Sequence, residues 1–262
     1  MITFLTVLIG GDVISDSDYE FIKLFLASFS ASLIAAGGNV INDIYDIELD
    51  KIVHPERPLP QGLITITSAK YFYFGLNLCS ILILILTNYI LFFIGLAVII
   101  LLFFYASSFK KKFAISNVII SFLTGMTFVF AGITVNNIEM SFIPAIYAFF
   151  INLIREIVKD TEDAEGDIKF GINSIPIILG LFKTKIIISI LILFLTLLTI
   201  LPFVYDIYKI EYFIVIMIIV NPILLYSCIL FYQHKNKTEI KKVSTMLKFN
   251  MIFGLLAIYL GK

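Results

Sequence analysis

Cysteine and histidine are scarce in this chain of 262 residues, which contains two of each. Cys79 and Cys228 stand alone within apolar stretches, where a free cysteine behaves as a small hydrophobic side chain. His54 and His234 are far apart in the sequence. This scarcity argues against a disulfide framework and against a zinc site of cysteine and histidine.

Charge is also scarce, since charged residues make up 15% of the chain and the formal net charge is zero. A balanced net charge gives no indication of a nucleic-acid partner. Hydrophobic residues make up 60% of the chain, well above the near-half that is usual for soluble domains. The composition therefore indicates an integral membrane protein, with the lipid bilayer as its surroundings.

Eight apolar stretches are long enough to cross a membrane, because a spanning helix needs about 20 mostly apolar residues. They lie near 21–41, 67–87, 89–108, 114–135, 141–158, 184–204, 212–232 and 243–260. The apolar opening at 1–9 is too short to cross alone and lacks the features of a signal peptide. We expect it to be the end of a first helix, short or truncated.

The connections between these stretches are short and leave no room for a separate soluble domain. The sequence therefore predicts an all-α fold. We expect one polytopic membrane bundle of about nine transmembrane helices, arranged around a central cavity and covering residues 1–262 as a single domain.

Basic residues gather in alternate connections. With a cytoplasmic N-terminus and nine crossings, sixteen of the nineteen Lys and Arg residues fall on one side, and only Lys23, Lys209 and Lys262 fall on the other. Because cytoplasmic loops are enriched in Lys and Arg, this bias orients the chain as a multi-pass protein of the cell membrane.

Acidic residues gather in two places, since eleven of the nineteen Asp and Glu residues lie within 42–66 and 155–167. Both stretches contain D-x-x-D-x-x-x-D, formed by Asp43, Asp46 and Asp50 and by Asp160, Asp163 and Asp167. Corresponding residues are 117 positions apart, which indicates either a diverged internal repeat or convergence on one spacing. The spacing i, i+3, i+7 puts three carboxylates on one helix face, and both motifs fall on the cytoplasmic side.

Carboxylates concentrated in this way repel each other unless solvent or cations offset the repulsion. Mg²⁺ prefers hard oxygen ligands and is commonly bound by one or two carboxylates together with substrate phosphates. Asn39 and Asn42 lie one turn apart beside the first motif, which favours a functional site over solvated loop charges. We therefore predict that the two motifs form two halves of one Mg²⁺-diphosphate site.

A proline-rich segment, 51–62, follows the first motif and carries Arg57; its three prolines and glycine argue against regular helix. Arg57 can bind a phosphate through its planar fork, or pair with Glu56, or simply mark the cytoplasmic side, and we favour the phosphate. Three lysines follow Tyr105, and Lys110 is the one we expect to turn inward.

Arg155 and Lys159 lie one turn apart just ahead of Asp160. Basic side chains and Mg²⁺ together make a pocket suited to diphosphate. The adjoining apolar helices suit a long hydrocarbon tail.

At these residues the chain resembles the UbiA superfamily of intramembrane prenyltransferases, whose first motif reads N-D-x-x-D-x-x-x-D. Asn42 to Asp50 match that motif in full, and the resemblance spans essentially the whole chain. Within the superfamily, segments 50–62 and 155–167 resemble the archaeal digeranylgeranylglyceryl phosphate synthases. Chlorophyll synthases share the proline loop but have a different second motif.

Two features depart from the family pattern. The first helix usually begins with an Arg-Pro-x-Asn-like stretch, so an Asn ligand from that helix is missing here or lies upstream of a truncated start. The family's Y-x-x-x-K element is shifted, because four residues separate Tyr105 from Lys110.

The resemblance implies transfer of a geranylgeranyl group from geranylgeranyl diphosphate to the free hydroxyl of geranylgeranylglyceryl phosphate, in archaeal ether-lipid synthesis. It implies Mg²⁺ at Asp43, Asp46, Asp50, Asp160, Asp163 and Asp167, which are also the catalytic candidates. The candidates for substrate binding are Asn39, Asn42, Lys51, Arg57, Tyr105, Lys110, Arg155 and Lys159. For the acceptor's phosphate, the candidate partners are Lys51, Arg155 and Lys159.

Other functions stay open at this point. Another prenyl acceptor, of aromatic or tetrapyrrole type, would use the same metal ligands. A transporter with intramembrane carboxylates is disfavoured, because the acids collect at one side of the membrane. A phospholipid-head-group transferase lacks its D-G-x-x-A-R signature here.

Overall fold

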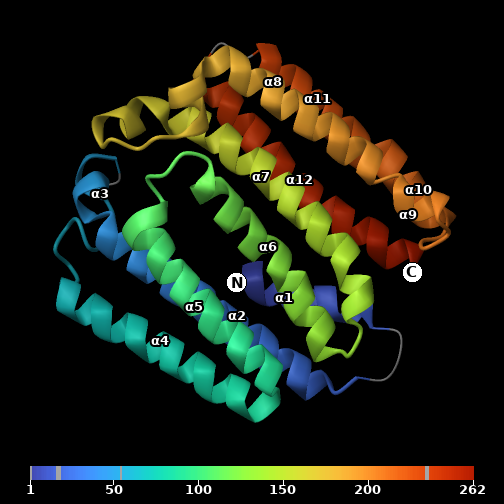
Figure 1. The fold of residues 1–262 in the computed structure, drawn as a ribbon, viewed down its shortest axis with the longest axis horizontal. Coiled ribbons are helices and arrows are strands. Elements are labelled where there is room, and N and C mark those ends of the chain that lie inside the picture. The colour runs from blue at the N-terminus through green and yellow to red at the C-terminus, as the bar shows by residue number, and fades with distance from the viewer. Residues whose placement is uncertain (1, 16–18, 54, 234–235) are drawn as a thin grey trace. The chain divides into compact units, whose positions relative to one another are not determined.

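The computed structural model describes residues 2–15, 19–53, 55–233 and 236–262, so His54 and His234 lie outside the described residues (Figure 1). Every regular element in these ranges is a helix. The elements are α1 (Ile2–Ile14), α2 (Phe21–Tyr45), α3 (Ile47–Val53), α4 (Ile66–Thr87), α5 (Tyr89–Phe104), the π-helix η1 (Tyr105–Phe109), α6 (Ile115–Thr134), α7 (Ile138–Lys169), α8 (Ile175–Leu198), α9 (Leu201–Val204), α10 (Ile210–Val215), the π-helix η2 (Ile216–Val220), α11 (Asn221–Gln233) and α12 (Lys237–Gly261).

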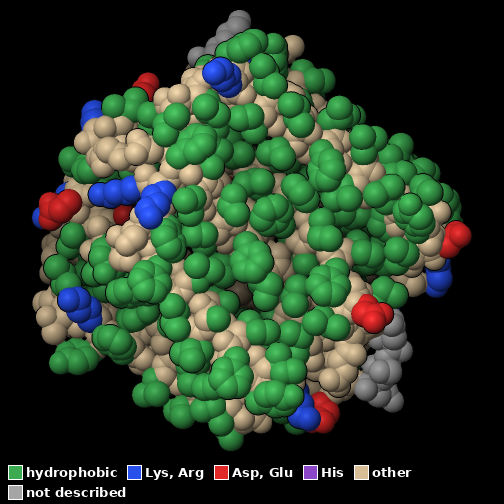
Figure 2. All heavy atoms as spheres, viewed as in Figure 1, with side chains coloured by type: hydrophobic (Ala, Val, Ile, Leu, Met, Phe, Trp, Pro, Cys, Tyr) green, Lys and Arg blue, Asp and Glu red, His purple; other side chains and the backbone are tan. Residues whose placement is uncertain are grey.

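Among the described residues, eight helical segments are long and apolar enough to cross a membrane, and they correspond to the eight predicted stretches. α1 is shorter, with 13 residues. Hydrophobic side chains predominate on the face shown in Figure 2, as expected for a surface in contact with lipid. The prediction of an all-α polytopic membrane fold is therefore confirmed.

The chain divides into two compact units that interleave in the sequence. The first contains Met1–Lys111 and Met126–Ser141, and the second contains Lys112–Gly125 and Phe142–Lys262. Whether the chain behaves as one domain stays a prediction.

In the first unit, α2 packs against α1, α4 and α5 (Figure 1). Small residues allow the close approach that membrane helices use for packing. The Ser30 and Ser80 hydroxyls are 2.7 Å apart between α2 and α4. Gly37 leaves room for the Asn77 amide, since a Cβ at Gly37 would lie 3.0 Å from its Nδ2. This packing carries the acidic end of α2 to η1, which also contacts α2.

In the second unit, α11 packs against α8 and α12, and α10 packs against α12. Tyr212 is fully buried there and its hydroxyl donates to the Thr199 carbonyl at 2.7 Å. A Cβ at Gly261 would lie 2.2 Å from the Cβ of Tyr212 and 3.0 Å from its backbone N, so only glycine fits at this crossing. The backbone N–H of Lys209 donates to the Gly261 carbonyl at 2.8 Å and ties the end of α12 to α10.

Candidate active site

The first acidic motif lies where α2 gives way to α3. α2 ends at Tyr45, and Asp46 follows with φ −93° and ψ 2° before α3 begins. The backbone N–H of Asp46 bonds the Asn42 carbonyl at 2.9 Å, and that of Asp50 bonds the Asp46 carbonyl at 2.8 Å. The motif was expected on one face of a helix; the helix is interrupted at Asp46, although backbone bonds of the i→i−4 type continue across it. The helix also runs on through Lys51 to Val53, into the segment expected to be irregular.

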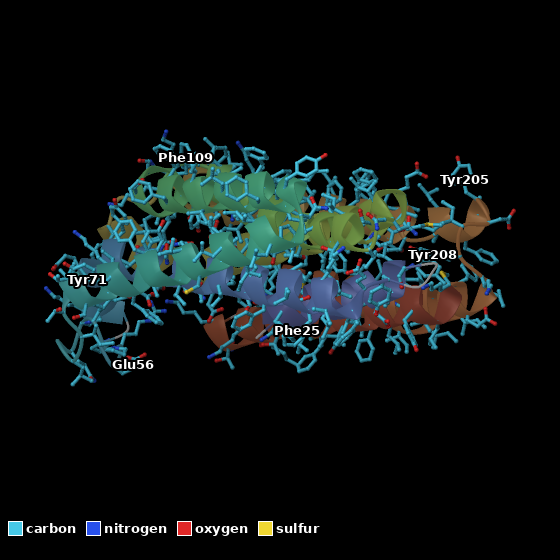
Figure 3. The ribbon with its side chains drawn as sticks, turned by 90° about the horizontal axis from the view of Figure 1, so that it is seen from below. Phe25, Glu56, Tyr71, Phe109, Tyr205 and Tyr208 are labelled. Carbon is cyan, nitrogen blue, oxygen red and sulfur yellow. The ribbon has the colours of Figure 1, made fainter. Side chains whose placement is uncertain are left out.

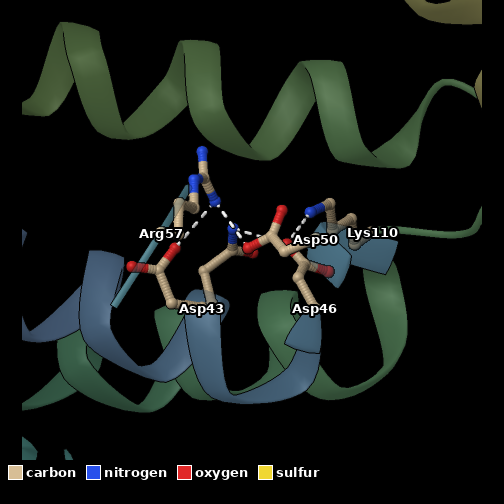
Figure 4. Close-up of polar contacts among 6 residues, drawn as sticks. Asp43, Asp46, Asp50, Arg57 and Lys110 are labelled. Carbon is tan, nitrogen blue, oxygen red and sulfur yellow. Dashed lines mark hydrogen bonds and ion pairs between the residues drawn. The ribbon is translucent and has the colours of Figure 1, made fainter. Parts of the chain in front are cut away.

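Six side chains meet at this interruption, and we call them the first acidic cluster (Figure 4). They are Asn42, Asp43, Asp46, Asp50, Arg57 and Lys110. Nη1 of Arg57 donates to Asp43 Oδ1 at 3.1 Å and to Asp50 Oδ2 at 2.7 Å. Oδ2 of Asp46 accepts from Lys110 Nζ and, at 2.8 Å, from Asn42 Nδ2. Each carboxylate of the motif thus contacts a basic side chain of the same unit.

The loop after α3 holds Arg57 in place. The Gln61 N–H bonds the Arg57 carbonyl at 3.1 Å, and Gly62 takes the left-handed conformation (φ +71°) that closes the turn. Burial lowers the pKa of Arg57, but the hydrogen bond to Asp50 and the charges of Asp50, Asp43 and Asp46 outweigh it and raise that pKa. Arg57 is therefore a permanent cation. In this structure its partners are the carboxylates of the motif.

Lys110 reaches the cluster through the π-helix η1. Its N–H bonds the Tyr105 carbonyl at 3.0 Å, across five residues instead of four. The wider π turn absorbs one extra residue, so Lys110 returns to the helix face that a lysine four places after Tyr105 would occupy in an α-helix. The π turn explains why four residues, instead of three, separate Tyr105 from Lys110. In the sequence, that extra residue was the sign of the π turn.

Two predicted residues lie apart from the contacts of the first acidic cluster. Asn39 is exposed on α2. Lys51 is half exposed and bonds Glu48 at 2.7 Å, one turn away on α3. In Figure 3, Glu56 of the loop and Tyr71 of α4 lie at the same end of the first unit, away from Phe25 of α2. The cluster belongs to this end, because Arg57 is the neighbour of Glu56.

The second acidic motif lies in the second unit, on one unbroken helix, as expected. α7 runs from Ile138 to Lys169 and carries Asp160, Asp163 and Asp167. Asn117 of α6 is buried and donates from Nδ2 to Asp160 Oδ2 at 2.8 Å. The sequence reasoning missed Asn117, whose signal is a polar residue within an apolar stretch.

Glu156 forms ion pairs with both Arg155 and Lys159. The sequence reasoning also missed this residue. Nη1 of Arg155 donates to Glu156 Oε1 at 2.9 Å. Nζ of Lys159 lies 3.7 Å from Glu156 Oε2. One carboxylate thus holds two cations on the same stretch of α7, and the trio carries a net positive charge.

The donor chemistry of the first acidic cluster fits Mg²⁺, although its carboxylates face basic side chains. Within the described ranges, no group of three or more His, Cys, Asp and Glu residues is gathered closely enough to hold a metal ion. Asn42 nevertheless presents a buried Oδ1 without a hydrogen-bond partner beside the three carboxylates. These are the hard oxygen donors that Mg²⁺ prefers.

Comparisons with known proteins identify the family of the chain. The sequence model of the UbiA prenyltransferase family matches residues 3–252. A digeranylgeranylglyceryl phosphate synthase of Methanosphaera stadtmanae is 36% identical over 100% of this chain and 94% of its own length. The corresponding protein of Methanocaldococcus jannaschii is 36% identical over 97% of this chain and 89% of its own length.

Solved structures show the same fold. The structure of a digeranylgeranylglyceryl phosphate synthase matches with a TM-score of 0.80 and 35% identity, over 99% of this chain and 92% of the other. A UbiA homolog from Archaeoglobus fulgidus, bound to GPP and Mg²⁺, matches with a TM-score of 0.69 and 17% identity, over 98% and 96% of the two chains. With its acidic motifs in place and nearly all of its length matched, the chain belongs to the UbiA prenyltransferase family and is a membrane prenyltransferase.

Proposed function

We propose that this protein transfers a geranylgeranyl group from geranylgeranyl diphosphate to the free hydroxyl of geranylgeranylglyceryl phosphate, releasing diphosphate, in archaeal membrane ether-lipid biosynthesis. The observation that carries the proposal is the first acidic cluster, where three carboxylates and two cations gather in an otherwise apolar chain. The choice of acceptor is supported by relatives of near-equal length that are named digeranylgeranylglyceryl phosphate synthase.

The donor's diphosphate would bind with Mg²⁺, held by Asp43, Asp46 and Asp50 with the free Oδ1 of Asn42. Bound there, the ion would offset the charge that develops on the leaving diphosphate. A UbiA homolog from Archaeoglobus fulgidus solved with GPP and Mg²⁺ supports a divalent metal beside a prenyl diphosphate, though not the choice of ligands. Asp160, Asp163 and Asp167 stay predicted as further ligands.

Arg57 and Lys110 would change partners when the donor binds. In the structure they pair with the three carboxylates and offset two of their three negative charges. Guanidinium and ammonium groups bond phosphate oxygens as readily as carboxylates, and both carry several N–H donors. We infer that they turn to the diphosphate oxygens and stabilise negative charge as the bond between C1 and oxygen breaks.

The acceptor hydroxyl oxygen then forms the new bond to C1 of the prenyl group, and its proton passes to a base, for which the released diphosphate and a carboxylate of the second motif are the candidates. The apolar helices would keep water from capturing the allylic cation first. The basic residues on one side of the predicted topology support a cytoplasmic location for this chemistry.

The test uses purified protein, labelled geranylgeranyl diphosphate and Mg²⁺ with a panel of acceptors: geranylgeranylglyceryl phosphate, an aromatic quinone precursor and a tetrapyrrole. We expect label in a diether lipid phosphate. Transfer to the aromatic or tetrapyrrole acceptor, with none to the glyceryl phosphate, would sink the lipid assignment. Formation of labelled geranylgeraniol in the absence of any acceptor would indicate hydrolysis instead of transfer.

A further inference from the structure

Two buried N–H donors on α7 have no hydrogen-bond partner. They are Nδ2 of Asn152 and Nε of Arg155. Asn152 is only 6% exposed. Buried polar groups in folded proteins are nearly always hydrogen-bonded, so each exception needs an explanation. Because both unpartnered atoms are donors, a group that satisfies their hydrogen bonds must be an acceptor.

The two donors are placed to act together. Asn152 and Arg155 are three positions apart on a helix, so their side chains lie on the same face, one turn apart. Glu156 accepts a hydrogen bond from Nη1 of Arg155 and holds the guanidinium in place through that nitrogen, not through Nε. Nε is buried and makes no hydrogen bond, so the side chain must shift before an oxygen atom can reach it.

The ion pairs nearest this donor pair leave a net positive charge, although the carboxylates of Asp160, Asp163 and Asp167 follow on the same helix. Arg155 and Lys159 share the single carboxylate of Glu156, which leaves one positive charge uncompensated within the trio. A phosphate monoester offers several acceptor oxygens and one or two negative charges. A guanidinium edge together with an amide N–H suits such a group.

We propose that Asn152 and Arg155 bind the phosphate of the acceptor substrate, a prenylated glyceryl phosphate. This inference rests on the proposed function, in which the donor's diphosphate is assigned to Arg57 and Lys110. The acceptor brings a second phosphate that those two residues do not serve. The donor pair on α7 makes the enzyme selective for acceptors that carry a phosphate.

The test compares Asn152→Leu and Arg155→Lys with the wild-type enzyme. Leucine keeps the size of asparagine and removes the amide, whereas lysine keeps the positive charge and removes Nε. Asn250→Leu is the matched control, because Asn250 is 1% exposed on α12 and both of its side-chain polar atoms are also unpartnered. The unfolding temperature of each variant shows whether it folds.

Two measurements are made on each protein. The first is thermal stabilisation by geranylgeranylglyceryl phosphate or by geranylgeranylglycerol, without donor or Mg²⁺, which reports binding independently of turnover. The second is the KM for acceptor and for geranylgeranyl diphosphate. Loss of a hydrogen bond to a charged group should weaken binding of the phosphorylated acceptor about tenfold or more in Asn152→Leu and Arg155→Lys. Binding of the phosphate-free alcohol and the KM for the donor should stay unchanged.

Three outcomes would overturn the inference. An equal rise in the KM for geranylgeranyl diphosphate would assign the donor pair to the donor. An equal loss of acceptor binding in Asn250→Leu would indicate a packing effect. Unchanged acceptor binding in both α7 variants would mean that water satisfies the two N–H groups. If the wild-type enzyme binds the phosphorylated acceptor but does not prenylate it, the proposed function fails and the phosphate site stands.

Discussion

Arg57 is the residue on which the first acidic cluster depends most. One guanidinium nitrogen bonds both Asp43 and Asp50, and the Asp50 side chain is only 4% exposed. Removing the cation would leave a buried carboxylate unpaired, which is far costlier than losing an exposed pair. Arg57 itself is 39% exposed, so solvent screens part of the effect.

We expect Arg57→Gln to lower the free energy of unfolding by about 2 kcal/mol in metal-free protein. Denaturant unfolding of both proteins in detergent measures this change in the free energy of unfolding. Lys51→Gln is the control, since Lys51 pairs with Glu48 in an exposed position and should cost less than about 0.5 kcal/mol.

Mg²⁺ should stabilise Arg57→Gln more than it stabilises the wild-type protein, because no guanidinium then competes for the carboxylates. An equal shift in unfolding temperature for both proteins would contradict the exchange of partners at Arg57.

Sequence reasoning at the residue scale found the carboxylates but missed Asn117 and Glu156. The carboxylates stand out by charge and repeated spacing in an apolar chain. The partnership of Asn117 with Asp160 spans 43 positions and depends on how α6 packs against α7. Nothing in the local sequence specifies that packing.

At the scale of elements, α7 carries the second motif as one helix of 32 residues. Gly166 lies inside it, and a Cβ there would meet nothing within 4 Å. Gly125 of α6 is the opposite case, because its Cβ would lie 2.7 Å from the Ala145 carbonyl oxygen.

We therefore expect Gly166→Ala to stabilise the protein by about 0.5–1 kcal/mol, since alanine favours the helix that glycine weakens. Gly125→Ala should destabilise it, because a backbone atom must move. Unfolding of the two variants under the same conditions tests this. Destabilisation by Gly166→Ala would mean that α7 is not helical at its acidic end.

A second prediction at this scale concerns the π-helix η1. Deleting Ser108 restores three residues between Tyr105 and the lysine and converts the π turn to an α turn, which returns the lysine to the same face. We expect the deletion to keep prenyltransfer activity within about tenfold, whereas an alanine inserted after Ser108 should rotate the lysine away and abolish it. Equal losses in both variants would refute this role for η1.

The helices themselves could be predicted, because apolar runs of spanning length leave few alternatives. The interruption at Asp46 and the π turn at Tyr105 could not, since each depends on the backbone geometry of one or two residues. Asp46 and Lys110, which contact each other, lie at these two irregular points.

At the scale of the whole molecule, composition alone was enough to predict a polytopic helical membrane protein, which the eight spanning segments confirm. The central cavity stays a prediction. So does the orientation, which rests on the placement of basic residues.

Orientation can be measured with single cysteines in a Cys79→Ser, Cys228→Ser background. Lys111 and Lys209 are both exposed and fall on opposite sides of the predicted topology. In intact cells a membrane-impermeant maleimide should label Lys209→Cys, and should label Lys111→Cys only after permeabilisation. The reverse pattern would place the first acidic cluster outside the cell.

Prenyl transfer at the first acidic cluster is tested most directly by single-turnover transfer in proteoliposomes, with geranylgeranyl diphosphate, geranylgeranylglyceryl phosphate and Mg²⁺. Asp46→Asn should slow product formation at least about a hundredfold, as removal of a group that stabilises transition-state charge does. Asp206→Asn is the matched control, because Asp206 is exposed in a left-handed turn that asparagine tolerates. Chelation of Mg²⁺ should stop the wild-type reaction. Near-normal turnover by Asp46→Asn, or undiminished turnover in chelator, would contradict a metal-assisted reaction at this cluster.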